Sequence, residues 1–595
     1  MKSIAVLYAA LLCAPNGVMN VYASEKQLQE KGTVRRTKKK GVTKKKAKAS
    51  TSMEAIVDVA IIGAGFGGLH IADALLYDPL EENKERDSPT VMVLEEKSSV
   101  GGRAIDIKFD AAPDVWVGMG PWRIIFDQFL GHRLIKRFGL ETIPFSIDRG
   151  ANSMTARGMR STNRTKIADE RFFTDDPSKG FIDFITEAIV AASTTDRYDH
   201  SGGHKSFITD LFGGEGWEQY KLNFHTFRGD YDLFSVWEEL VAAGRRSFFL
   251  SGEDRINAVR SIVGGWSVLA KALAAAIEFN EKATLKLETE VTSVDYDLKD
   301  DVYVLTANDG NGQLKIFAKK VVFSVPKSAM AKIQGSIGEA IKSTDGYKSV
   351  APYPVAKAAA VWEDKWWEPI LGDDDNDGIY NQAQGFSECF RMIPYNFESN
   401  YTANVVHTAY TGEECAHLID RLSKLPKEVA DAELIRHLER MFPELKGNIP
   451  MPLESAYIFH DGGWHFNHPR TMTHEQTHEW ALDPLGGIHK ARVMMVAEAW
   501  ARARGWVEAA FDIGADALER NFNMTIRPNV PGFVEGSRDY WPPKQPFEVN
   551  WPSKYFGDGR RKAKESLTFR QLKETLEDAD VKRQLVDIIE FANTL

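Results

Sequence analysis

The hydrophobic pattern of the chain becomes regular near residue 55. An apolar run broken only by Asp58 covers residues 56–62, and β-branched side chains make up much of it. A short run without strict alternation is typical of a parallel strand that is buried on both faces. A helical pattern follows over 69–77, and a second short apolar run covers 91–94. The order strand, turn, helix, strand predicts the start of an open α/β sheet.

The pattern changes in the next part of the chain. Residues 125–250 are richer in helical spacing and in aromatic side chains, and they predict helices over 181–192 and 233–243. Residues 253–278 resemble a pair of helices that is broken at Gly264-Gly265. This region therefore favours a helical domain inserted after the first strands.

Alternation returns after residue 280. Residues 283–325 alternate between apolar and polar side chains, and Asp309-Gly310 within them is a hairpin signal. Residues 351–410 favour a second, mixed sheet, and 418–442 are helical in pattern. Residues 493–523 return to a strand followed by a helix. The sequence contains no internal repeat.

Both ends of the chain differ from the middle. Residues 24–54 carry Lys38-Lys39-Lys40 and Lys44-Lys45-Lys46 with little apolar material between them, which predicts a disordered basic arm. The tail 527–595 begins with prolines and tryptophans and ends in a charged, amphipathic helical pattern.

Composition places the chain among ordinary globular proteins. It has 595 residues, of which 43% are hydrophobic and 27% charged, so several domains with sizeable cores are expected. The isoelectric point near 5.9 gives no indication of nucleic-acid binding. Residues 1–50 hold twelve Lys/Arg and two Glu, and the whole chain carries −10, which leaves −20 on the rest. A basic arm therefore precedes an acidic body.

The first residues resemble a targeting segment. Lys2 precedes a short apolar run over 4–12, and Val21-Tyr22-Ala23 is an acceptable cleavage site. This pattern predicts a signal peptide over 1–23 and a protein of the secretory pathway. No later stretch is long and apolar enough for a transmembrane helix, so no membrane-spanning segment is expected.

Cysteines and sequons bear on the same question. Outside the predicted signal peptide the chain has Cys389 and Cys415, which would form one disulfide in an exported protein or remain as two buried thiols. No pair has the spacing of metal ligands, so no metal is expected. Asn-x-Ser/Thr sequons begin at Asn163, Asn400 and Asn523, and they matter only in a glycosylating pathway.

A glycine-rich turn is the first candidate for chemistry. Gly63-Ala64-Gly65-Phe66-Gly67-Gly68 lies between the first predicted strand and its helix. Gly63 permits the tight turn, Gly65 lets the backbone approach a pyrophosphate, and Gly68 permits close packing of helix on strand. The helix N-terminus offers N–H groups to the phosphates. In this context the motif predicts a dinucleotide site.

Residues near the end of the second strand extend that site. Glu95 ends the strand, where a carboxylate can accept both ribose hydroxyls. Gly101-Gly102-Arg103 follows and adds backbone donors and a cation near the pyrophosphate. Taken together, Glu95, the Gly-Gly-Arg segment and the glycine turn resemble the flavin-containing amine oxidase family. The resemblance implies FAD, and we expect it to be non-covalent because no Cys lies in the C-terminal flavin motif.

The C-terminal half carries the second part of this resemblance. Ala497-Glu498-Ala499 and Gly505-Trp506-Val507-Glu508 are similar to the family's second flavin motif, in which the glutamate contacts the ribityl chain and the backbone near the valine meets the pyrimidine ring. Ala497 and Ala509 stand where the family usually has glycine. Val291 matches the strand beneath the adenine. The resemblance covers about residues 56–525.

A second arginine motif indicates the substrate. Gly120-Pro121-Trp122-Arg123 resembles a segment of L-amino-acid oxidases whose arginine binds the substrate carboxylate, and we expect Gly120, Pro121 and Trp122 beside the flavin. A guanidinium binds a carboxylate through two parallel charge-assisted hydrogen bonds. Arg123 is therefore the predicted carboxylate clamp, with a structural salt bridge as the alternative.

Two further residues complete the expected catalytic set. Lys357, followed by Trp366-Trp367, matches the family's lysine that holds a water against flavin N5, although a surface lysine on a sheet edge is an alternative. Trp464, in Gly462-Gly463-Trp464-His465, resembles the segment that closes an aromatic cage around the substrate amine, and it could equally be a core residue. Weaker candidates are His465 and Arg391. Trp500 and Trp506 are expected near the flavin, and Arg391 and Tyr395 lie in the region where amino-acid oxidases have a tyrosine as second carboxylate ligand.

The resemblance implies oxidative deamination of an L-amino acid to a 2-oxo acid, ammonia and hydrogen peroxide. The substrates expected are a small amino acid or amine and molecular oxygen, with no nucleic acid, and the sequence leaves a homodimer open. Alternatives are a polyamine or monoamine oxidase, an enzyme like tryptophan monooxygenase, and a non-catalytic protein that keeps FAD for stability.

The expected fold is α/β, with a Rossmann-like FAD-binding domain, a mixed-sheet substrate domain and a helical domain, as in amine oxidases. The predicted divisions are a signal peptide (1–23), a basic arm (24–54), FAD-binding segments (55–124, 251–330 and 485–526), a helical domain (125–250), a substrate-binding domain (331–484) and a tail (527–595).

Overall fold

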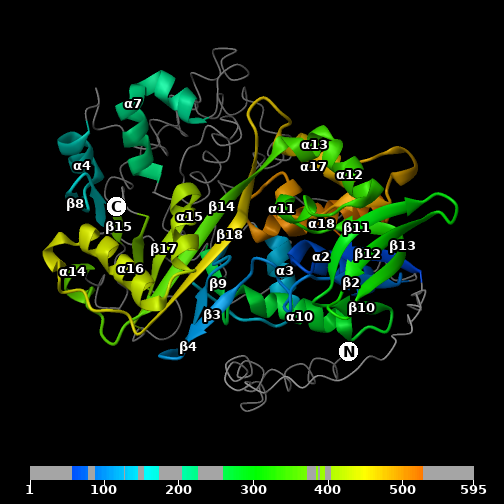
Figure 1. Cartoon of the computed structure of the whole chain (residues 1–595), viewed down its shortest axis with the longest axis horizontal. Helices are drawn as coiled ribbons and strands as arrows, with labels where there is room; N and C mark the ends of the chain where they lie inside the picture. The colour runs from blue at the N-terminus through cyan, green and yellow to red at the C-terminus, as the bar shows by residue number, and fades with distance from the viewer. Residues whose placement is uncertain are drawn as a thin grey trace, which may run out of the picture. The chain divides into compact units, whose positions relative to one another are not determined.

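The computed structural model describes most of the body of the chain (Figure 1). The described residues all belong to the unit Met53–Leu595, and they are 56–77, 88–125, 128–144, 153–172, 204–224, 259–371, 383–385, 389–394 and 404–526. Several expectations lie outside them, namely the signal peptide, the basic arm, the helices over 181–192 and 233–243, Tyr395, Asn400 and the tail. In the part of the chain that the structure describes, no helix is long and apolar enough to cross a membrane.

The first sheet is built on the two apolar runs identified in the sequence. In spatial order its strands are β10 (Ala283–Lys286), β2 (Val91–Leu94), β1 (Val57–Ile62), β13 (Gln313–Phe323), β12 (Val302–Asn308) and β11 (Glu290–Asp297), with β19 (Val493–Met495) paired to β13. The pairs of β1 with β2 and of β1 with β13 are parallel, whereas β11, β12 and β13 pair antiparallel. The expected α/β fold and the hairpin at Asp309-Gly310 are thus confirmed.

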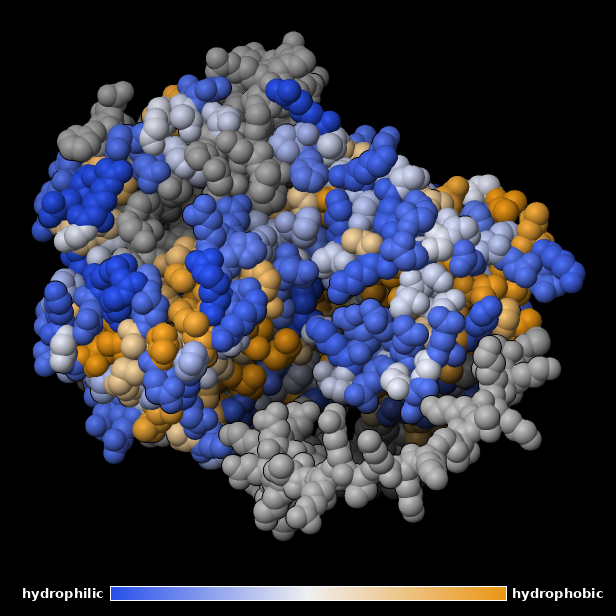
Figure 2. Space-filling model, in the orientation of Figure 1, coloured by the Kyte–Doolittle hydropathy of each residue, from blue (hydrophilic) through white to orange (hydrophobic). Residues whose placement is uncertain are grey.

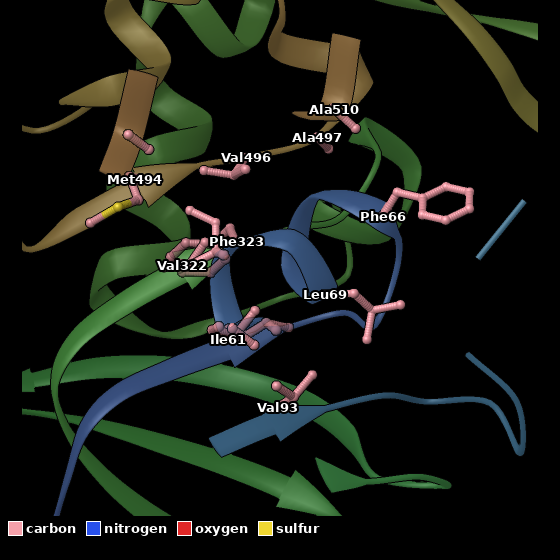
Figure 3. Close-up of a cluster of buried hydrophobic side chains, with 14 of the residues drawn as sticks. Ile61, Phe66, Leu69, Val93, Val322, Phe323, Met494, Val496, Ala497 and Ala510 are labelled. Carbon is pink, nitrogen blue, oxygen red and sulfur yellow. The ribbon is translucent and has the colours of Figure 1, made fainter. Parts of the chain in front are cut away.

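The core of this sheet explains why distant segments meet. Helix α2 (Phe66–Tyr77) packs against β1 and β2 and also against α10 (Trp266–Glu278) and α18 (Val507–Asn521). Figure 3 shows side chains from β1, α2, β2, β13 and β19 gathered in one apolar cluster, including Ile61, Phe323 and Met494. These three side chains are fully buried or nearly so. Burial of this apolar surface holds together segments more than 400 residues apart.

The second sheet is mixed. Its order is β18 (Glu454–Asn467), β14 (Val350–Val361), β17 (Val405–Gly412), β16 (Arg391–Pro394), β15 (Ala383–Gly385), β7 (Ser153–Ala156) and β8 (Met159–Ser161). Alternate residues of β14 face opposite sides. Ala356, Ala358 and Ala360 pack towards α15 (Glu413–Leu422) and α16 (Lys427–Met441), whereas Ala359 and Val361 pack against the hairpin of β3 (Asp106–Phe109) and β4 (Ala112–Gly118).

A small third sheet lies between these parts in sequence. It consists of β5 (Ile124–Ile125), β9 (Val259–Ile262) and β6 (Thr142–Pro144), all antiparallel. Helices α3 (Phe129–Arg137), α4 (Arg164–Arg171) and α7 (His204–Phe224) also fall in the early part of the chain. Short helices α11 (Lys327–Met330), α12 (Gly335–Ser343), α13 (Asp345–Ser349), α14 (Glu368–Leu371) and α17 (His474–Leu482) complete the described helices that are longer than one 3-10 turn.

Three local expectations need correction. The helix pair over 253–278 is wrong in its described first part, because residues 259–262 form β9 and only Trp266–Glu278 is helical; the β-branched residues pair with β5 and β6 instead. The helical pattern over 418–442 is confirmed in part, since it falls on two helices, and Pro426 cannot continue α15 and begins α16. The expected helical domain 125–250 also contributes β7 and β8 to the second sheet.

The two remaining cysteines are bonded to each other. Cys389 and Cys415 form a disulfide that joins the residue two positions before Arg391 to α15. Of the two possibilities that the sequence left open, the structure has the disulfide.

The surface is mostly hydrophilic on the face shown in Figure 2, with smaller groups of hydrophobic side chains. Four of the large hydrophobic side chains that are exposed lie near the start of α16 and of β18, namely Leu425, Val429, Met451 and Leu453.

Candidate active site

The glycine-rich turn is shaped by close backbone packing. Gly63 follows β1 with φ of +98°, and a Cβ there would lie 2.6 Å from the carbonyl oxygen of Ser324. A Cβ on Gly68 would lie 2.2 Å from the carbonyl oxygen of Gly63, and one on Gly67 2.5 Å from that of Val496. Any larger residue would push α2 away from β13 and β19. These glycines therefore set the distance between the helix N-terminus and the sheet.

The same turn leaves room where a pyrophosphate would bind. A Cβ on Gly65 would meet only the Ser324 carbonyl oxygen, at 4.0 Å, and one on Gly102 would meet only the Cα of Gly65, at 3.6 Å. The first turn of α2 carries no acidic residue. Its N–H groups and positive dipole end thus face an open space bounded by glycine backbone, which fits a dinucleotide phosphate.

Glu95 is placed as expected beside this turn. One carboxylate oxygen accepts the N–H of Ala64 at 2.8 Å, and the other accepts the N–H of Lys97 at 3.0 Å. Burial raises the pKa of Glu95, and these two N–H groups oppose that rise. Thr289 donates its N–H to the Glu95 carbonyl, and Val291 follows at the start of β11. The residues just before β11 are therefore bonded to the segment of Glu95, and the first residues of that strand, with Val291, follow directly.

The segment after β4 passes closely over Arg103. A Cβ on Gly120 would lie 2.0 Å from the Arg103 carbonyl oxygen, so only glycine fits there. The next residues, Pro121 and Trp122, lead into β5. The Trp122 indole N–H donates to the Gly118 carbonyl, and its own carbonyl accepts from Ser261 Oγ at 2.9 Å. These two hydrogen bonds of Trp122 thus fix the backbone just before Arg123.

The arginine of the Gly-Gly-Arg segment is bonded to residues of two other segments. Arg103 Nη1 donates to the carbonyl oxygens of Gly462 at 3.0 Å and Gly463 at 2.7 Å, and to Glu498 Oε2 at 3.0 Å. Its charge therefore joins the two flavin motifs and β18, and a place of this cation near the pyrophosphate stays a prediction.

Glu498 is the centre of that network and is fully buried. Oε2 also lies 2.9 Å from His465 Nδ1, and Oε1 accepts the Gly505 N–H at 2.8 Å. Burial favours the protonated acid, but Arg103, His465 and the Gly505 N–H outweigh it and lower the pKa of Glu498 to about 2. The carboxylate is therefore ionised at neutral pH.

The two alanines of the second flavin motif are part of the core. Ala497 and Ala509 are both buried in the main core. Trp506 is the residue before α18, and Val507 is the first residue of that helix. Glu508 then accepts the N–H groups of Leu130 at 2.9 Å and Gly131 at 2.8 Å, which caps α3.

Lys357 is buried, which excludes the alternative of a surface lysine. Its side chain is on β14, and Nζ donates to the carbonyl oxygens of Gly118, at 3.3 Å, and of Gly120. Nζ also lies 3.7 Å from the centre of the Trp122 ring and 4.6 Å from that of Tyr410. Burial lowers the pKa of Lys357 well below 10.5, and the charge of Arg123 acts in the same direction.

Arg123 is close enough to Lys357 to affect its ionisation. The guanidinium carbon lies 5.7 Å from the centre of the Trp506 ring. Among the described residues no carboxylate forms an ion pair with Arg123, and no side chain or backbone group forms a hydrogen bond with it. The alternative of a structural salt bridge is therefore not seen in the described part of the chain.

Aromatic rings line the sheet beside Lys357. Trp464 is stacked on Tyr353 with 5.8 Å between ring centres, and its ring stands nearly perpendicular to that of Tyr410 at 6.0 Å. Tyr410 also lies 5.1 Å from Trp122. Trp464 is only half-buried. Its place at the edge of this aromatic group fits a wall better than a core residue.

Sequence reasoning did not find two residues of this group, Tyr410 and His407. In the strand register Tyr410 is opposite Lys357, and His407 packs 4.4 Å from Trp122. Burial lowers the pKa of His407 well below its usual range, as do the charges of Lys357 and Arg391. Alternation along β17 is irregular at the Ala358/Ala359 bulge, so the sequence alone could not show that both side chains share the face of Lys357.

The charges around Lys357 are mostly positive. The groups that shift its pKa are Arg123 and Arg391, which lower it, and Asp106, which raises it. The Asp106 carboxylate is itself bonded to the N–H of Ser267 at 2.7 Å, at the start of α10. The site therefore favours a ligand with a negative group.

One cluster has the composition of a metal site but contains its own cation. His478, Asp512 and Asp516 lie close together. Arg502 donates to both aspartates. Burial lowers the pKa of Arg502, but the neighbouring acids outweigh burial, so that the pKa is raised. A guanidinium already fills the role that a metal ion would have.

Comparisons with known proteins agree with this geometry. The family model for flavin containing amine oxidoreductase matches residues 66–514, well over half of the chain. The solved structure of wild-type putrescine oxidase bound to putrescine aligns with a TM-score of 0.57 and 19% identity, over 79% of this chain and 100% of that one. A mutant of putrescine oxidase aligns with a TM-score of 0.55 and 18% identity, over 78% and 99%. At these identities the likeness concerns the fold. No curated protein sequence matches the chain.

Proposed function

Because this chain belongs to the family of flavin-containing amine oxidoreductases and therefore uses FAD, we propose that it oxidises the α-amine of an L-amino acid. The products are a 2-oxo acid, ammonia and hydrogen peroxide, formed from the amino acid, water and dioxygen. The observation that carries this proposal is Arg123, a guanidinium without an ion-pair partner among the described residues, next to Lys357 and Trp506.

The side chains divide the work of binding. Arg123 binds the substrate carboxylate through two parallel hydrogen bonds, and this contact fixes the position of Cα. Trp464 and Tyr410 form adjoining walls that exclude water and orient the remaining part of the substrate. When bound, FAD supplies the redox chemistry, in which a hydride leaves the substrate Cα and two electrons finally reach dioxygen.

Lys357 handles protons and water in this proposal. Burial lowers its pKa, so the amine gives up a proton more readily than a surface lysine, and its contacts with two carbonyl oxygens and the Trp122 ring fix its position. An amine so held can bind a water for hydrolysis of the imino acid or donate a proton during reduction of oxygen.

A polyamine or monoamine oxidase is the second candidate, because putrescine oxidase shares the fold. A diammonium substrate would lie near the positive charges of Arg123 and Arg391, which surround Lys357. Like charges in a buried site repel strongly. The charge of the site therefore favours the amino acid.

We further propose that FAD is held non-covalently and that the chain enters the secretory pathway. The Cys389–Cys415 disulfide supports the second point, because such bonds persist in oxidising compartments. Mass determination of the mature protein would show whether residues 1–23 are removed.

The decisive experiment compares anaerobic bleaching of the flavin by L-amino acids and by the corresponding decarboxylated amines. For Arg123→Ala we expect a loss of about 2–4 kcal/mol of carboxylate binding, which corresponds to a roughly 30- to 1000-fold lower kcat/KM for amino acids. Arg520→Ala, which removes a surface ion pair with Glu479, is the matched control and should behave as the wild type.

The two outcomes separate the candidates. Bleaching by amino acids alone, with loss in Arg123→Ala, supports the amino-acid oxidase. Efficient bleaching by amines in both proteins would replace that proposal with an amine or polyamine oxidase. If no amine reduces bound FAD, the protein is a non-catalytic FAD-binding protein.

A further inference from the structure

The network around Glu498 contains a histidine that binding of the flavin does not obviously require. His465 is on β18 and is fully buried. Its Nδ1 lies 2.9 Å from Glu498 Oε2. The residue before it is Trp464, which we placed in the substrate wall. The bond of His465 thus connects two parts of the site, the strand segment that bears Trp464 and the second flavin motif.

The backbone on the other side of Trp464 is fixed in the same way. Arg103 donates to the carbonyl oxygens of Gly462 and Gly463, and the same nitrogen donates to Glu498. The stretch 462–465 is therefore held on both sides of Trp464 by residues from two separate flavin motifs. A Cβ on Gly463 would lie 2.4 Å from Val355 of β14, which leaves little freedom for the strand to move.

The ionisation of the imidazole is also defined. Burial lowers the pKa of His465, although Glu498 opposes this, so the ring is neutral at physiological pH. Since Glu498 is ionised and can only accept, the proton of the neutral ring must be on Nδ1. Nε2 then has a lone pair, and no described group bonds to this buried atom.

A buried acceptor without a partner is unfavourable. If His465 served packing alone, an apolar side chain could replace it without loss of stability. The presence of a histidine here therefore indicates that the bond from Nδ1 to Glu498 is what matters.

We propose that His465 is a positioning residue that couples the flavin motif at Glu498 to the substrate wall at Trp464. Its bond keeps Glu498 in place for the cofactor and at the same time fixes the orientation of the strand that presents Trp464. The part concerning the substrate rests on the proposed function, whereas the part concerning the flavin does not.

The proposal predicts a change in the pH at which FAD is released. The titratable groups facing Glu498 are Arg103 from the first flavin motif, which is charged, and His465 from β18, which is neutral, with Arg504 near the imidazole. A depressed carboxylate pKa stabilises the folded site at pH values above the ordinary pKa, and this stabilisation is lost as the pH falls through the folded-state pKa. Removal of one donor raises that folded-state pKa, so the loss begins at a higher pH.

The experiment uses the FAD-loaded enzyme and the variants His465→Leu and His465→Asn. Leucine fills much of the volume without a donor, whereas the amide nitrogen of asparagine can replace Nδ1. His437→Leu removes another buried histidine that is bonded to a glutamate, Glu433 on α16, and is the matched control. Flavin fluorescence during acid titration gives the pH of half-release, and steady-state kinetics give kcat and KM separately.

For His465→Leu we expect half-release about one pH unit above the wild type and a roughly tenfold higher KM with a smaller change in kcat. His465→Asn should restore most of both values, and His437→Leu should change neither. Equal behaviour of the leucine and asparagine variants, or release and KM values like the wild type in His465→Leu, would overturn the proposal. If amino acids are not substrates at all, acid release still tests the flavin part by itself.

Discussion

At the scale of single residues, Lys357 is held in surroundings that oppose its charge. The side chain is buried, its nearest contacts are carbonyl oxygens and aromatic rings, and neighbouring arginines repel it. Carbonyl oxygens and ring faces attract a cation but replace bulk water incompletely. An amine in this position gives up its proton far more readily than one on the surface, which suits a group that exchanges protons with substrate or water.

This leads to a prediction about stability and pH. Because the folded-state pKa of Lys357 is lowered, the unfolded chain binds this proton more strongly, so the free energy of unfolding rises with pH between the folded-state pKa and about 10.4. Relative to Lys357→Met, the wild type should therefore gain stability as the pH is raised, by up to about 1.4 kcal/mol per pH unit. Urea unfolding of both proteins at a series of pH values, with saturating FAD, measures the difference.

The variant itself provides the control for other titrating groups, since they remain in both proteins. A difference in unfolding free energy that stays constant from neutral to alkaline pH would show that Lys357 keeps an ordinary pKa in the folded protein. Flavin reduction and reoxidation in Lys357→Met, followed separately, would then show which half of the reaction needs the amine.

At the scale of elements, the second sheet brings the site residues together from three adjacent strands. β14 supplies Lys357, β17 supplies Tyr410 directly opposite it, and β18 supplies Trp464 opposite Tyr353. The bulges in both pairings change which side chains share a face. The register of the strands therefore determines which side chains form the substrate wall. The geometry of the wall also depends on the elements that neighbour these strands.

The disulfide fixes one of those neighbours. Cys389 precedes β16, which carries Arg391, and Cys415 belongs to α15, which covers the opposite face of the sheet. Replacing both cysteines by serine should lower the free energy of unfolding by about 3 kcal/mol, because the open chain of the unfolded state gains freedom. KM should rise more than kcat falls, because Arg391 contributes to the field around Lys357.

Reduction provides an independent comparison. Treatment of the wild type with a dithiol should reproduce the stability of the Cys389→Ser/Cys415→Ser variant, and the same treatment should leave that variant unchanged. A variant as stable as the oxidised wild type in urea would show that the bond contributes nothing to the folded body.

At the scale of the whole molecule, the flavin site is assembled from segments far apart in sequence. The turn after β1, the hairpin strand β11 and the segment before α18 each contribute residues, and they meet only through the shared core of the first sheet. A ligand that contacts all of these segments stabilises the folded state against the unfolded one by mass action.

Addition of FAD should therefore raise Tm in a concentration-dependent manner. At a free concentration of one hundred times Kd the expected stabilisation is about 2.7 kcal/mol, which corresponds to a shift of roughly a few °C in a chain of this size. Calorimetry or thermal scanning of the protein after removal of flavin measures it. Riboflavin lacks the pyrophosphate and adenosine that the glycine turn and Glu95 would bind, so it should stabilise less at the same concentration. An equal effect of riboflavin would contradict the assignment of that turn.

The sequence determined those features that depend on neighbouring residues. The glycine turn, the strands at 57–62 and 91–94, the hairpin at Asp309-Gly310 and the position of Glu95 follow from local backbone conformations and from short hydrophobic runs. The motifs of the family resemblance are likewise local, which is why the sequence alone predicts Arg123, Lys357 and Glu498 as site residues.

The tertiary structure decided which of these residues meet. Tyr410 and His407 join Lys357 only because two strands pair in one register with a bulge, and nothing within β17 itself marks those two positions. Arg103 binds Glu498 and β18 because the chain folds residues 103, 463 and 498 into contact. Residues 259–262 form a strand since partners at 124–125 and 142–144 are present to receive their hydrogen bonds. Such long-range pairing depends on the burial of the whole core, and a window of neighbouring residues does not contain that information.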